Sequence, residues 1–263
     1  MIKRKLGIFA ECIHGLDSKN TLPLIKNAGF DCYATGVYEF ESCKELTEAG
    51  KALGLTCDFI HAPFSGINKM WFSGMDYLDI YEKIKQSIDT ASACGIPTII
   101  MHLSSGWDAP AINDLGLSRF DALVEYAAEK GVSIAFENLR KVGNLAYFAD
   151  RYEKISNVGF CYDFGHEHCY TKTVKWMDIF TDRVIATHIH DNFGIKEKYE
   201  IKTDLHLLPF DGDIDYAKIM RKLDEYGYSG SLILEVGNSR HLTMKHEDFL
   251  ADCYDRVKRI SEM

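Results

Sequence analysis

The sequence predicts a (β/α)8 barrel, because one junction recurs along it and eight short apolar runs alternate with amphipathic segments. At this junction a helical stretch ends in glycine, which adopts the left-handed conformation of a helix C-terminus at little cost. An apolar residue and a β-rich run follow each glycine, which is the pattern of repeated βα units. The junction occurs at Ala28-Gly29-Phe30, Leu53-Gly54-Leu55, Cys94-Gly95-Ile96, Lys130-Gly131-Val132 and Tyr226-Gly227-Tyr228.

The eight apolar runs are the predicted strands, and most of them lack polar alternation, as expected when both strand faces are buried. Between them, residues such as Tyr77, Tyr81 and Ile84 share one helical face. Eight such units favour a closed barrel over a doubly wound sheet, and no GxGxxG follows the first strand. No linker divides the chain, so we expect one domain over residues 1–263. The predicted strands are Leu6–Ala10, Cys32–Val37, Cys57–His61, Thr98–His102, Val132–Glu137, Val158–Asp163, Val184–His188 and Leu232–Glu235.

Composition narrows the class of protein. With 46% hydrophobic and 26% charged residues the chain resembles an ordinary globular protein. Its eight cysteines form no CxxC pair, which indicates reduced thiols rather than a disulfide framework. No run resembles a signal peptide or a membrane span, so we expect a cytoplasmic protein. The net charge of −9 disfavours duplex nucleic acid as a partner, and homo-oligomerisation stays open.

An imidazole or a carboxylate stands where each of six consecutive predicted strands ends. In such barrels the C-terminal strand ends converge on one mouth, where activity resides. Three carboxylates packed there without a cation would repel one another and raise their pKa values. A divalent metal removes this repulsion, and mixed ligation suits Zn, Mn, Co or Fe, with Mg as a further candidate. The six residues are His61, His102, Glu137, Asp163, His188 and Glu235, and His166 follows shortly after Asp163.

Each of these residues taken alone has an ordinary structural explanation. A single strand-end histidine is commonly a hydrogen-bonded structural residue, and a single acidic residue there is commonly a helix N-cap. Six successive coincidences are much harder to explain in this way, so we predict a metal site. The remaining histidines are expected at the surface or behind the site, with His14 the one that could reach the mouth; the others are His168, His190, His241 and His246.

The motifs between His61 and Glu235 resemble the xylose isomerase-like barrel superfamily, which contains sugar isomerases, epimerases and an apurinic-endonuclease branch. In the epimerase branch, Glu, Asp, His and Glu on strands five to eight hold one metal. The loop after strand seven, Asp204-Leu205-His206-Leu207-Leu208-Pro209 followed by Gly212-Asp213-Ile214-Asp215, is similar to a loop of sugar-phosphate isomerase-like members. The resemblance implies a metal site at Glu137, Asp163, His188 and Glu235.

The resemblance further implies a metal-dependent isomerase or epimerase of a small sugar-like substrate, phosphorylated or not. The metal would bind a carbonyl and a neighbouring hydroxyl and stabilise an enediolate, while Glu137 and Glu235 take and return the proton. His166 would orient a substrate oxygen. We expect one tightly held cation, with His61 and His102 contacting substrate or water. The remaining candidates for substrate contact are Asn138, Asn192 and Trp107, then the loop aromatics Phe64 and Trp71, and for phosphate the isolated Lys196, Lys198 and Arg240.

Two alternatives remain open. One is a metal-dependent phosphodiester hydrolase of the apurinic-endonuclease type, for which His61, His102, His166, Asp204 and His206 are candidate additional ligands. Against it, His-Ile-His-Asp-Asn stands where that branch favours His-Leu-Asn-Asp-Ser, and Asp-Phe-Gly-His where it favours Asp-Thr-Cys-His. The loops after strands one to four also lack the cluster of Arg and Lys that a duplex would require. The other alternative is a non-catalytic sugar-binding barrel, which would keep the pocket but lose a proton-transfer group.

Overall fold

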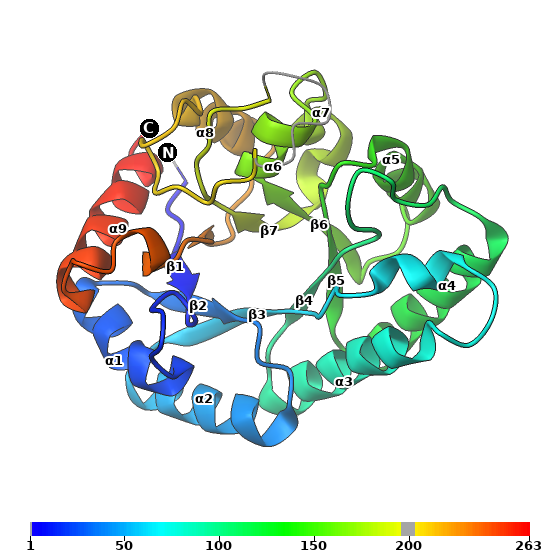
Figure 1. The fold of residues 1–263 in the computed structure, drawn as a ribbon, viewed down its shortest axis with the longest axis horizontal. Helices are drawn as coiled ribbons and strands as arrows, with labels where there is room; N and C mark the ends of the chain where they lie inside the picture. Colours follow the sequence, from blue (N-terminus) through cyan, green and yellow to red (C-terminus); the bar gives the residue numbers. More distant parts are fainter. Residues whose placement is uncertain (1, 196–202) are drawn as a thin grey trace.

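The computed structural model, which describes residues 2–195 and 203–263, contains one eight-stranded parallel sheet in the order β7-β6-β5-β4-β3-β2-β1-β8 (Figure 1). The sheet closes just beyond β7, where the Ile189 amide donates to the Ile233 carbonyl at 2.9 Å and the Glu235 amide donates to the Ile189 carbonyl at 3.0 Å. The predicted (β/α)8 barrel is confirmed. Its strands are β1 Leu6–Phe9, β2 Cys32–Thr35, β3 Thr56–His61, β4 Thr98–Met101, β5 Ser133–Glu137, β6 Val158–Asp163, β7 Val184–His188 and β8 Leu232–Leu234.

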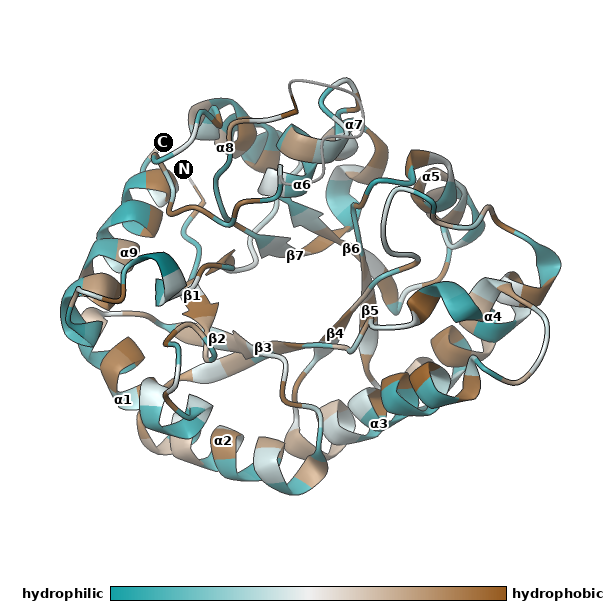
Figure 2. Ribbon diagram, viewed as in Figure 1, coloured by the Kyte–Doolittle hydropathy of each residue, from teal (hydrophilic) through white to brown (hydrophobic). Residues whose placement is uncertain are grey.

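Helices surround the barrel, and Figure 2 shows many hydrophilic residues on this outer ring. The predicted glycine junctions are present: Gly29 and Gly95 end α1 and α3 with φ of 109° and 70°. The α-helices are α1 Ser18–Ala28, α2 Phe40–Ala52, α3 Leu78–Cys94, α4 Asp114–Glu129, α5 Val142–Arg151, α6 Phe164–Tyr170, α7 Trp176–Phe180, α8 Tyr216–Glu225 and α9 His246–Ser261, and the short 3-10 helices are η1 Ile67–Trp71, η2 Thr181–Arg183 and η3 Asn238–Arg240.

The two-residue period of a strand divides the barrel core into an outer and an inner part. On β5, Ile134 and Phe136 belong to the core cluster shared with the helices, whereas Ala135 belongs to a separate inner cluster. Glu137 lies two residues after Ala135, so its side chain continues the inner face at the mouth. The same spacing holds on all six strands, because the inner residues Phe59, Ile100, Ala135, Cys161, Ala186 and Ile233 precede His61, His102, Glu137, Asp163, His188 and Glu235.

Two further observations bear on the expectations from composition. All eight cysteines are free thiols, as the sequence predicted. Among the residues that the structure describes, no helix combines the length and the apolar character that crossing a bilayer requires. Cytoplasmic location and homo-oligomerisation stay predictions.

Candidate functional site

The six strand-end side chains meet at the barrel mouth. Glu137, Asp163, His188 and Glu235 each present one ligand atom, and these four atoms lie within 4.8 Å of one another. Glu137 is 1% exposed and Asp163 and His188 are fully buried, whereas Glu235, with its side chain 23% exposed, reaches the surface. The residues expected as metal ligands are therefore close enough to share one cation.

Glu137 is the centre of this arrangement. Its Oε2 lies 2.9 Å from His102 Nε2 and 3.3 Å from His61 Nε2. Its Oε1 lies 2.9 Å from His166 Nδ1 and 3.5 Å from His188 Nδ1. One buried carboxylate therefore faces four imidazoles from four different elements of the barrel.

Three further groups of donors overlap or adjoin the central one. His61 and His102 form a group with Glu137, and His61 also forms one with His188 and Glu235. The third lies on the other side of the mouth, where the β7–α8 loop brings Asp204 and His206 against the start of α6; it consists of His166, His190, Asp204 and His206. The mouth thus has donors for more than one cation.

The polar atoms of the mouth lack partners to an unusual degree. Eight buried side-chain atoms of the described residues have no hydrogen-bond partner, and seven of them belong to Asp163, His188, His190, Asp204 and Glu235. Leaving a buried polar group unpaired costs about 1–3 kcal/mol, so native proteins rarely collect such groups in one place. Histidine nitrogens and carboxylate oxygens that share one point are suited to a transition metal, and these residues fit such an ion.

Without a cation, the negative charge of the carboxylates in the mouth is balanced by protons on the histidines. Burial raises the pKa of the Glu137 carboxyl, but the charges of His102 and His188 outweigh it and hold that pKa well below its usual range. Burial lowers the pKa of His166, whereas Asp163, Asp204 and Glu137 hold it well above its usual value. Histidine protons therefore compensate the carboxylates, and a cation would take over this role.

A cavity of about 250 Å³ opens above these residues. Among the described residues that line it, Arg140 alone carries a guanidinium or ammonium group. Arg140 lies over the Tyr170 ring at 3.7 Å and donates from Nη2 to the Tyr170 hydroxyl, while its buried Nε has no hydrogen-bond partner. Neither Arg140 nor Tyr170 was predicted, because single residues in these positions carry no recognisable pattern.

The two asparagines expected to contact substrate have other partners. Asn138 Nδ2 donates to the Asp163 carbonyl at 2.8 Å, and its Oδ1 accepts from the Asp163 amide at 2.7 Å. Asn192 Nδ2 donates to the Gly165 carbonyl at 3.0 Å, and its Oδ1 accepts from the Gly194 amide. Both are fully buried and absent from the cavity wall. That expectation is corrected: they hold the backbone around Asp163 and the loop after β7.

The predicted aromatic contacts divide into three cases. Phe64 lines the cavity and stacks on His102 with ring centroids 4.3 Å apart. Trp107 packs edge-on against Tyr170 at 5.9 Å, beside the lining residues. Trp71 is instead buried in the core, where its Nε1 donates to the Leu103 carbonyl, so it does not stack on a ligand.

Among the remaining histidines, His190 is the exception. His14 is exposed, His241 packs on Phe249, and neither lines the cavity. His190 is fully buried within a donor group, so of the two positions expected for it, at the surface or behind the site, the surface is excluded. The spacing His188-Ile189-His190 was the available signal, because residues two apart on a strand share a face. Of the phosphate candidates, Arg240 is exposed, and Lys196 and Lys198 lie outside the described residues.

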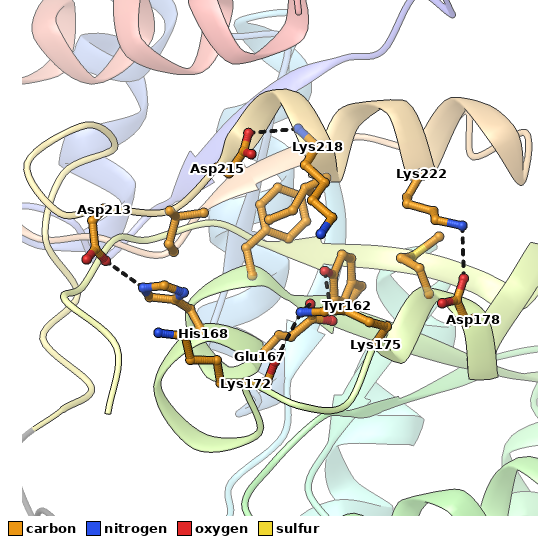
Figure 3. A pocket seen from close by; sticks show the side chains of 14 residues that line it. Tyr162, Glu167, His168, Lys172, Lys175, Asp178, Asp213, Asp215, Lys218 and Lys222 are labelled. Atoms are coloured by element: carbon orange, nitrogen blue, oxygen red, sulfur yellow. Dashed lines mark hydrogen bonds and ion pairs between the residues drawn. The ribbon is translucent and has the colours of Figure 1, made fainter. Parts of the chain in front are cut away.

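A second cavity, of about 400 Å³, lies outside the barrel between α6, α7 and α8 (Figure 3). His168 lines it and contacts Asp213 at 2.6 Å. Four lysines and four acidic residues line the cavity together, so it favours neither sign of charge; they are Lys172, Lys175, Lys218, Lys222, Glu167, Asp178, Asp213 and Asp215. None of the strand-end residues reaches it.

The protein is a (β/α)8 barrel whose strand ends bring histidines and carboxylates together. This arrangement is suited to metal binding at the mouth of the barrel. The sequence profile of the xylose isomerase-like TIM barrel family matches residues 22–253, and the chain belongs to this family.

Individual similarities are more distant. An uncharacterized protein of Sinorhizobium fredii is 31% identical over 195 residues, which are 69% of this chain and 60% of that relative. A solved D-tagatose 3-epimerase-like protein has a TM-score of 0.73 at 20% identity, with 98% of both chains covered. The 3-keto-D-glucoside 4-epimerase from E. coli has a TM-score of 0.72 at 16% identity, with both chains fully covered. At these identities the two structures establish a shared fold.

Proposed function

We propose that this protein is a metal-dependent isomerase or epimerase of a small sugar or sugar-like substrate, acting by proton transfer next to a carbonyl group. One observation carries the proposal: Glu137 and Glu235 approach the same imidazole, His188, at 3.5 and 3.2 Å beneath one small cavity. Two carboxylates from different strands that face one point are placed to remove a proton from a substrate carbon and to return one.

Glu137, Asp163, His188 and Glu235 would hold the cation. When bound, it would polarise a substrate carbonyl and stabilise the negative charge that develops on the oxygen. The side chain of Glu235 is 23% exposed and that of Glu137 only 1%, so Glu235 exchanges protons with solvent more readily. His61 and His102 contact Glu137 Oε2 and provide a route for protons to the enclosed carboxylate.

The cavity supports a small polar substrate. Ligand pockets for drug-sized molecules occupy about 300–1,000 Å³, and this cavity is smaller, at about 250 Å³. Its wall offers Arg140 and Tyr170 for hydroxyl, carbonyl or phosphate oxygens, and Phe64 as an apolar face. Two structural neighbours, a D-tagatose 3-epimerase-like protein and a 3-keto-D-glucoside 4-epimerase, support keto sugars as the class to test first.

The test is a turnover screen in deuterium oxide with metal-replete protein. Ketoses, inososes and their phosphates would be incubated, and deuterium at the carbon next to the carbonyl would be followed by NMR. We expect a product isomer that carries solvent deuterium. Turnover without deuterium incorporation would contradict the proton-transfer mechanism. Tight sugar binding without any exchange would instead favour the non-catalytic sugar-binding barrel.

A second candidate function is a metal-dependent phosphodiester hydrolase. The observation that favours it is the presence of donor groups on both sides of the central one, His61/His102/Glu137 on one side and His166/Asp204/His206 on the other. Neighbouring cations are typical of enzymes that stabilise both the attacking and the leaving oxygen at phosphorus. The two candidates make opposite predictions for abasic DNA.

A further inference from the structure

His190 occupies an unusual position for an imidazole. It is fully buried, and neither ring nitrogen forms a hydrogen bond. The ring stacks on that of His206, with centroids 3.9 Å apart and an interplanar angle of 7°. Two backbone hydrogen bonds between Asp191 and Leu207, of 2.8 and 2.9 Å, fix this register of the loop against the end of β7. The position of His190 is therefore built into the fold.

Four donors surround one point beside His190. Its Nε2 lies 3.5 Å from Asp204 Oδ1, and His206 Nε2 lies 3.3 Å from the same oxygen, which has no hydrogen-bond partner. His166 Nε2 lies 3.3 Å from the other oxygen of Asp204. Donors at about 2.1 Å from a tetrahedral zinc ion stand roughly 3.4 Å apart, close to the two separations from Asp204 Oδ1. An ion bound by both His190 and His206 lies near both ring planes, so the stacked rings would tilt apart on binding it.

The second ring nitrogens of His206 and His166 are engaged elsewhere, whereas Nδ1 of His190 has no partner. His206 Nδ1 contacts the Glu235 carbonyl at 2.8 Å, and His166 Nδ1 contacts the Asn138 carbonyl at 3.1 Å. Both contacts favour the tautomer whose Nε2 carries a free lone pair, as in histidines that bind metals. The Tyr170 hydroxyl donates to Asp204 Oδ2 at 2.8 Å, which leaves Oδ1 as the donor.

Gly165 has no side chain and thereby leaves the space that the His190 ring occupies. A Cβ atom at residue 165 would lie 2.0 Å from Cε1 and 2.4 Å from Nδ1 of the His190 ring, so any larger residue would displace it. Gly165 belongs to Asp-Phe-Gly-His and His190 to His-Ile-His-Asp-Asn, the two motifs that depart from the endonuclease-branch pattern. The two residues that depart from that pattern, Gly165 and His190, contact each other in the structure, so they form one structural change.

We propose that His190, in the space left by Gly165, is a fourth protein ligand that closes His166, Asp204 and His206 into a four-coordinate zinc site. Four protein ligands leave no position for a reacting water, which is the arrangement of a structural zinc site. This cation would fasten the β7–α8 loop to α6 and take no part in catalysis. The inference rests on the proposed function only in requiring a mouth that binds transition metals, and it revises the expectation of a single cation.

The primary test is a crystal of the full chain loaded with zinc chloride, with anomalous scattering measured at the zinc edge. We expect one peak at the Glu137 group and a second one ligated by His190 Nε2. A second peak without His190 among its ligands, or no peak there while the Glu137 group is loaded, would overturn the inference and leave the proposed function intact. Absence of the peak at the Glu137 group would count against the proposed function instead.

Variants give a second readout that does not depend on activity. His190→Asn and Gly165→Ala should each lower zinc affinity at this site by about tenfold or more, measured by chelator competition, and should keep the other cation. Gly143→Ala is the matched control, because a Cβ there meets nothing within 4 Å. Amide exchange in residues 203–209 should accelerate in the first two variants only. Unchanged affinity in folded Gly165→Ala protein, checked by circular dichroism, would contradict the proposal.

Discussion

Glu235 Oε2 lies 3.2 Å from His188 Nδ1, yet both atoms are buried and neither forms a hydrogen bond. The two atoms are close enough for a hydrogen bond but are not aligned for one. Asp163 Oδ2, also without a partner, lies 3.7 Å from the same nitrogen. A cation between these atoms would satisfy all of them.

Removing a ligand of the central group should remove its cation. We expect zinc-replete protein to lose most of that metal in Asp163→Ala and in His188→Ala, because the buried ion would lack both charge and coordination. Metal would be quantified by mass spectrometry after dialysis. His14→Ala, at an exposed histidine that belongs to no donor group, is the control and should retain wild-type content. Undiminished metal at the central group in both ligand variants would disprove the site.

Replacing either glutamate should abolish proton exchange. Glu137→Gln and Glu235→Gln keep the side-chain shape but cannot shuttle a proton at neutral pH, so deuterium incorporation should fall by about 10²–10⁴-fold. Each variant would be compared at equal metal occupancy, since both residues are proposed ligands. Glu48→Gln, at an exposed position on α2, should exchange at the wild-type rate. If a variant still incorporates deuterium at the wild-type rate, the replaced glutamate is not the acid or the base.

His61 and His102 should affect substrate more than the central metal. Both contact Glu137 Oε2 and line the cavity, but neither belongs to the group of Glu137, Asp163, His188 and Glu235. The double variant His61→Ala/His102→Ala should therefore raise KM while the central cation remains. Anomalous scattering would check occupancy. A wild-type peak ligated by His61 or His102 would strengthen the hydrolase alternative.

Metal binding should weaken as the pH falls. Burial lowers the pKa of His188, but the Cys161 side chain and the carboxylates of Glu235 and Glu137 outweigh this and hold it well above its usual value without a cation. The imidazole must lose its proton to bind metal, so affinity should rise with pH until the raised pKa is passed. Chelator competition between about pH 6 and 8, together with proton release in weak buffer, would measure it. Affinity independent of pH would refute this charge balance.

Abasic duplex DNA should not be cleaved at a useful rate by metal-replete protein. The chain carries a net charge of −9, and Arg140 is the one Lys or Arg among the described residues lining the mouth. Backbone docking relies on several cationic contacts, so productive binding should be weak. A gel assay of incision would decide. Efficient cleavage that declines steeply with salt and disappears on chelation would establish the hydrolase reading in place of the epimerase.

The sequence alone determined the barrel and the histidines and carboxylates at six of its strand ends. Both depend on local periodicity: a buried parallel strand is a short apolar run, a glycine ends the preceding helix, and a two-residue period sets which side chains point inward. Glu137 follows Ala135 on the inner face in the same way as Asp163 follows Cys161. Because the strand ends of a closed barrel must converge, spacing along the chain was sufficient.

Only the tertiary structure decided what surrounds that ring of strand ends. Asn138 and Asn192 looked like substrate contacts, but backbone groups brought close by folding use their amide atoms. His190 was placed by the pairing of Asp191 with Leu207 and by the space at Gly165, which are contacts between segments distant in sequence. Loop positions follow from such long-range hydrogen bonds and steric fits, whereas the local period from His188 to His190 indicates only that the two side chains share a face.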